Sequence, residues 1–138
     1  MRGLTPAAAA RIEKEQLTTL ARRLTAATAT GDVQWEVREP DCYHWASADG
    51  SVRVASRDRD GEPPYELAIY DAHDTKVDEL SSELLGEEPA PWNQGLAELY
   101  RAARRNALRA DQIVDALIGA LTTAGDRAEP AEARASDA

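Results

Sequence analysis

The chain has 138 residues and a formal net charge of −9, with 25 acidic side chains against 16 basic ones. That length suits one domain with a real core, and no apolar run is long enough to span a membrane. The only cysteine is Cys42, which excludes an internal disulfide and a CxxC metal or redox motif. The acid excess disfavours generic binding to DNA or RNA, because phosphate backbones repel it.

Arginine outnumbers lysine by fourteen to two, and alanine is frequent, a bias typical of high-GC bacterial genomes. The sequence after Met1 passes into an alanine run without the leucine-rich stretch of a secretory signal. We therefore expect a bacterial, cytoplasmic protein. The acid is concentrated in residues 31–91, which hold sixteen acidic and five basic side chains.

Residues 6–29 are predicted to form a helix. Pro6 fits the first helical turn, where a missing N–H costs nothing. Leu17, Leu20 and Leu24 recur at helical spacing, and Gly31 provides a natural end.

The apolar period then changes from 3.6 to 2. Residues 33–37 alternate between apolar and polar side chains, and 43–46, 52–54 and 65–70 repeat the pattern. Asp49–Gly50 between two such runs is a strong hairpin signal. Four consecutive strands with short links predict an antiparallel meander.

Residues 76–85 admit two interpretations. One is a short strand over 76–80 that turns straight back from the preceding strand. The other is a helix with Val77, Leu80 and Leu84 on one face. We favour the strand.

Residues 92–124 have a helical pattern, as one long helix or as two that meet at a tight turn near Arg109. Residues 125–138 contain no large apolar side chain and are predicted to be a disordered acidic tail. The fold class is therefore α+β, with a single domain over residues 1–124. It comprises an N-terminal helix, a four- to five-stranded antiparallel meander, and a C-terminal helix or helical hairpin packed on one sheet face.

Cys42 and His44 are separated by one residue on a predicted strand, so both would point to the same face. With His73 they would supply three metal ligands, and a small metal-dependent enzyme or ligand-binding domain is the alternative function. The sequence holds no nucleophile elbow and no phosphate-binding glycine loop. We therefore expect a protein that is not an enzyme and binds no cofactor.

A further alternative is nucleic-acid binding through an arginine stripe near the C-terminal end. Its members recur at helical spacing and would grip phosphates along one helix face. They are Arg101, Arg104, Arg105 and Arg109.

The leading hypothesis is a non-catalytic protein-binding or regulatory module, chaperone- or immunity-like in charge and size only. Its partner would be another protein, with a second copy of the chain as one candidate. Helices that cover one sheet face leave the other face free, and we expect that face to be acidic. The candidate protein-binding surface comprises Glu36, Arg38, His44, Arg53, Glu66 and Tyr70.

Overall fold

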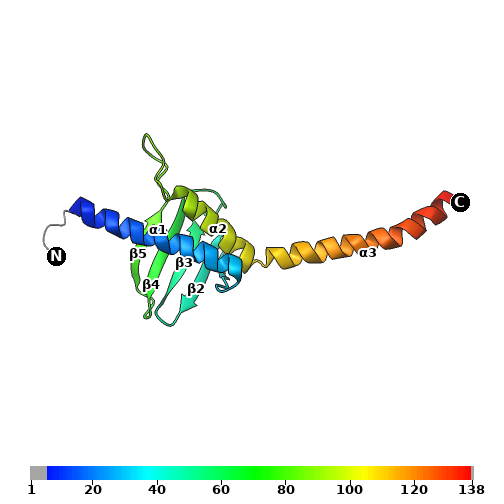
Figure 1. The fold of residues 1–138 in the computed structure, drawn as a ribbon, viewed down its shortest axis with the longest axis horizontal. Helices are drawn as coiled ribbons and strands as arrows, with labels where there is room; N and C mark the ends of the chain where they lie inside the picture. Colours follow the sequence, from blue (N-terminus) through cyan, green and yellow to red (C-terminus); the bar gives the residue numbers. More distant parts are fainter. Residues whose placement is uncertain (1–5, 138) are drawn as a thin grey trace. The chain divides into compact units, whose positions relative to one another are not determined.

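The computed structural model describes the backbone of residues 6–137 and the side chains of residues 13–125. Its elements confirm the predicted α+β class (Figure 1). In chain order they are helix α1 (Pro6–Thr30), strands β1 (Glu36–Glu39), β2 (Cys42–Ser47), β3 (Gly50–Ser56), β4 (Tyr65–Asp71) and β5 (Lys76–Ser81), and helices α2 (Asn93–Ala107) and α3 (Ala110–Asp137). None of the described helices is both long and apolar enough to cross a membrane.

The five strands form one antiparallel sheet in the order β1-β2-β3-β4-β5, as the meander prediction requires. The strand interpretation of residues 76–80 is confirmed, because β5 pairs with β4 from Lys76 to Ser81. The β2–β3 hairpin turns at Ala48–Asp49, and Ser47 pairs with Gly50 at its closed end. Gly50 is required there, since a Cβ at this position would lie 2.4 Å from the Tyr70 carbonyl oxygen.

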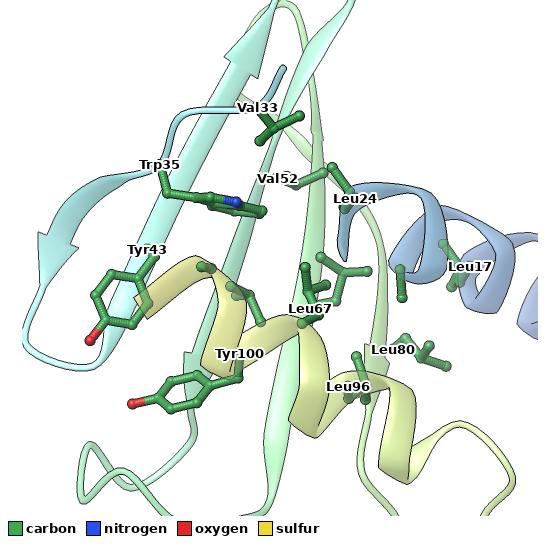
Figure 2. Packing of buried hydrophobic residues seen from close by; sticks show 14 residues of the cluster. Leu17, Leu24, Val33, Trp35, Tyr43, Val52, Leu67, Leu80, Leu96 and Tyr100 are labelled. Carbon is green, nitrogen blue, oxygen red and sulfur yellow. The ribbon is translucent and has the colours of Figure 1, made fainter. Parts of the chain in front are cut away.

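Helices α1 and α2 pack together over one face of the sheet, and the core lies between them and the strands (Figure 2). Alternate strand residues, including Tyr43, Val54 and Leu67, point into this core. The helices contribute Leu17, Ala21 and Leu24 from α1 and Leu96, Leu99, Tyr100 and Ala103 from α2. The opposite face of the sheet, hereafter the outer face, carries the side chains of the other parity.

Polar contacts of Trp35 join the end of α1, the start of the sheet and the end of α2. The Trp35 backbone N–H donates to Oδ1 of Asn106 at 2.6 Å. Its indole N–H donates to the buried Thr28 hydroxyl at 2.8 Å. These bonds satisfy polar groups that would be costly to bury unpaired.

The C-terminal region forms two helices, as one of the two interpretations expected. The helical path is interrupted at Arg109, which has a φ of +54°. The chain divides there into two compact units, Met1–Leu108 and Arg109–Ala138. Helix α3 continues beyond residue 125, where the sequence predicted a disordered tail, and its side chains from residue 126 on lie outside those described.

Candidate protein-binding surfaces

The outer face brings together residues that lie far apart in the sequence. The strand register aligns Glu36, His44 and Arg53 in one row across β1, β2 and β3. The same row continues through Ala68 to Glu79. Three of the six residues predicted for the binding surface therefore stand side by side, while Glu66 and Tyr70 flank the row on β4.

Arg53 occupies the centre of this face. Its guanidinium carbon lies 4.3 Å from the centroid of the Tyr70 ring, a cation–π contact. One terminal nitrogen, Nη2, lies 3.4 Å from Oδ1 of Asp74, which belongs to the β4–β5 turn. Tyr70, a residue of the predicted binding surface, is half-buried and in contact with this arginine. The Arg53 Nε atom is buried, and no group among the described residues accepts its hydrogen bond.

The charges of the outer face are mixed, which corrects the expectation of an acidic surface. Arg59 lies 3.4 Å from Glu39, Arg57 lies 3.4 Å from Glu66, and Lys76 pairs with Glu79. Some of the acid of residues 31–91 lies elsewhere, in the β2–β3 turn, the arm between β3 and β4, and the loop before α2.

A shallow hollow of about 150 Å³ lies among these ion pairs. Cys42 lines the hollow, and burial raises the pKa of its thiol above the ordinary value. A raised thiol pKa keeps the sulfur protonated near neutral pH, whereas nucleophilic and metal-binding cysteines act as thiolates. The hollow therefore lacks an activated cysteine.

His44 stands in the central row and is partly buried. Desolvation lowers its pKa, and the positive charges of Arg38 and Arg53 lower it further. Among the described residues, no three histidine, cysteine, aspartate or glutamate side chains are grouped so that they could hold a metal ion. Cys42, His44 and His73 therefore do not converge as the ligand set that the alternative function requires.

The predicted arginine stripe is divided between the two units. Arg101, Arg104 and Arg105 are exposed on α2. Arg109 is the first residue of the second unit, whereas the other three arginines belong to the first. No described aromatic side chain of α2 is exposed beside the three arginines, so stacking platforms for bases are not present on that helix.

One open groove was not predicted from the sequence. It lies beside α1, has a volume of about 620 Å³, and ends at Trp92 just before α2. The Lys14 ammonium lies 5.1 Å from the centroid of the Trp92 ring. The Trp92 indole N–H donates to the Ser81 carbonyl at 2.8 Å, so this ring is held in place.

Helix α3 presents the largest group of exposed apolar side chains that the structure describes on one helix. The five large residues, hereafter the α3 stripe, recur at helical spacing and lie on one face. Their exposed fractions are Ile113 54%, Val114 44%, Leu117 58%, Ile118 56% and Leu121 72%.

Comparison with protein-family models, with curated proteins and with solved structures gives no match for this chain.

Proposed function

We propose that this protein is a non-catalytic protein-binding module, and that the α3 stripe is its principal contact surface. The observation that carries the proposal is the exposure of five large apolar side chains on one face of α3. Each Å² of apolar surface that binding removes from water contributes about 25 cal/mol to the binding free energy. A partner that covers the α3 stripe therefore stabilises the complex substantially. Contiguous exposed apolar surfaces of this kind mark interaction sites.

The charge pattern of α3 favours a protein partner over a membrane or a nucleic acid. Residues 110–125 contain Asp111 and Asp115 and no lysine or arginine. Helices that lie on membrane surfaces carry a basic polar face that attracts anionic lipid. The same two carboxylates would oppose a phosphate backbone.

The outer face of the sheet is the second proposed contact surface. Its ion pairs are exposed or half-exposed and each contributes little to stability. The side chains of such pairs can form new ion pairs with a partner protein at a small net cost in free energy. This property suits residues that form the polar rim of a binding site. We further propose that the protein has a regulatory role and acts in the cytoplasm of a bacterium.

The experiment is capture of binding partners from a native lysate of the source cells, with three versions of the full chain. Leu117→Asp/Leu121→Asp places two charges within the α3 stripe. Gln112→Asp/Thr123→Asp adds the same charge at exposed positions away from the stripe and is the matched control.

We expect the wild-type chain and the control to retain the same partner, and the stripe variant to lose it. Circular dichroism in the near ultraviolet checks that the tryptophans of the first unit stay packed. Equal capture by all three versions, or capture of nothing specific at low salt by the wild type, would contradict the proposal.

A further inference from the structure

The groove beside α1 holds two basic side chains next to a fixed aromatic ring. The Lys14 ammonium lies over the Trp92 ring, and Arg22 donates to the Thr19 hydroxyl at 3.4 Å. Neither cation forms an ion pair with a described carboxylate. Glu15 is the single acidic residue among those that line the groove. The groove therefore has an excess of positive charge beside an apolar surface.

The two cations stand at separate positions along the groove. Lys14 and Arg22 are eight residues apart on α1, so their backbones are separated by roughly 12 Å at 1.5 Å per residue. Lys14 is held at Trp92, whereas Arg22 is held at Thr19. This arrangement suits a chain segment with two separated carboxylates and apolar side chains between them, rather than one small anion.

The loop between β5 and α2 has the complementary composition. Residues 83–89, hereafter the acidic loop, have the sequence Glu-Leu-Leu-Gly-Glu-Glu-Pro. Leu84 is 55% exposed and Leu85 is 94% exposed. The three glutamates are exposed, and none forms an ion pair with a described basic residue. Figure 1 shows this loop projecting beyond the sheet. Two adjacent exposed leucines are unfavourable in water unless another surface covers them.

The acidic loop matches the groove in charge, length and apolar character. An extended chain from Glu83 to Glu87 spans at most about 13 Å, close to the separation of Lys14 and Arg22. The two leucines lie between these carboxylates and fit the apolar surface beside Trp92. None of residues 83–89 lines the groove of its own chain, so the match calls for a second chain.

We infer that the groove beside α1 binds the acidic loop of a second copy of this chain. The groove and the loop belong to the same compact unit, Met1–Leu108, so a two-fold axis lets each chain place its loop in the other's groove. Each contact involves one short loop, and we therefore expect a reversible dimer that salt weakens. This inference goes beyond the binding role proposed for the α3 stripe and does not depend on it.

The first test is the molecular mass of the full chain by sedimentation over a dilution series at low salt. We expect twice the monomer mass at high concentration and the monomer mass on dilution. Lys14→Glu/Arg22→Glu, the groove variant, should weaken dimerisation roughly tenfold or more, because like charges then oppose each other. Arg23→Glu/Arg101→Glu makes the same charge change at exposed positions outside the groove and the loop, and should dimerise like the wild type.

The second test restores the charge complementarity by mixing two proteins. Glu87→Lys/Glu88→Lys, the loop variant, should weaken dimerisation like the groove variant. An equimolar mixture of the two variants should form heterodimers, because the basic loop of one meets the acidic groove of the other, while the second contact keeps its original charges. A mixture that stays monomeric, or a wild-type chain that is monomeric at every concentration, would overturn the inference.

The apolar part of the contact is tested with Leu85→Ser. This side chain is almost fully exposed, so the substitution should leave the melting temperature unchanged in circular dichroism and weaken the dimer. Unchanged dimerisation would overturn the placement of the acidic loop in the groove.

The failure of this inference is distinguishable from failure of the proposed function. Leu117→Asp/Leu121→Asp should dimerise like the wild type, because the α3 stripe takes no part in this contact. A dimer lost in that variant and retained in the groove variant would overturn the inference. A wild-type chain that stays monomeric, yet captures another protein through the α3 stripe, overturns the dimer and leaves the binding role standing.

Discussion

The hydroxyl of Tyr100 gives a sharp test of how α2 is anchored to the sheet. Tyr100 is buried, and its ring stacks on Tyr65 with centroids 4.5 Å apart. Its O–H donates to Oδ1 of Asp41 at 2.8 Å, a residue of the β1–β2 turn. Tyr100→Phe keeps the stacked ring and removes this bond, together with the contact of the hydroxyl with the Tyr43 side chain.

The expected cost follows from the charge of the acceptor. A hydrogen bond to a charged group contributes about 1.5–3 kcal/mol, and the half-buried position of Asp41 places the loss near the lower end. For a domain of this size, each kcal/mol lowers the melting temperature by roughly 4–8 °C. Urea unfolding followed by tryptophan fluorescence gives the free energy, and thermal circular dichroism gives the temperature.

Tyr65→Phe is the matched control. Its O–H donates at 3.1 Å to the Gly61 carbonyl, a neutral acceptor, so we expect a loss of only about 0.5–1.5 kcal/mol. If Tyr100→Phe costs no more than Tyr65→Phe, the reasoning about the charged acceptor at Asp41 is refuted.

Three further outcomes are expected. Leu67→Ala should lower the free energy of unfolding by roughly 2.7–5 kcal/mol in urea, because this side chain is fully buried, and a loss below about 1 kcal/mol would contradict its place in the core. Asn106→Ala should cost about 1–3 kcal/mol in the same assay by leaving the Trp35 N–H unpaired, and Asn106→Asp, which keeps an acceptor, should recover part of the loss. The lowered pKa of His44 means that its imidazole binds a proton more tightly in the unfolded chain than in the folded one. The free energy of unfolding should therefore fall as pH drops below about 6.5. His44→Gln should flatten that fall in unfolding free energies measured between pH 7 and 5; the account of His44 fails if this substitution leaves the fall unchanged.

The sheet was largely predictable because alternation survives in its central strands. Val52 and Val54 on β3 face the core with Leu67 on β4, as their period of two requires. Strand β5 was ambiguous because its two large apolar residues, Val77 and Leu80, are three positions apart and lie on opposite faces of the strand. Val77 is exposed while Leu80 is buried, and the pairing with β4 also shifts register between Ile69 and Tyr70.

The composition of the surfaces was less predictable. Net charge along the sequence does not indicate which face a charge occupies, so the acidity of residues 31–91 suggested an acidic outer face. The strand register instead places Arg53 at its centre, opposite His44 on β2 and Ala68 on β4. Likewise, helical periodicity identifies the apolar side of α3 but cannot distinguish a side buried within the chain from one exposed to a partner.

Amide hydrogen exchange along α3 tests most directly whether the α3 stripe is a contact surface. Most of the stability of a protein helix comes from packing of its apolar face, so the α3 amides should exchange faster in the free chain than when the stripe is covered. We predict that peptides covering Ile113–Leu121 become protected as a captured partner is added, and that Leu117→Asp/Leu121→Asp abolishes the protection. Exchange at these amides that is unchanged under all conditions, with protection gained only by peptides of the outer face, would contradict the account.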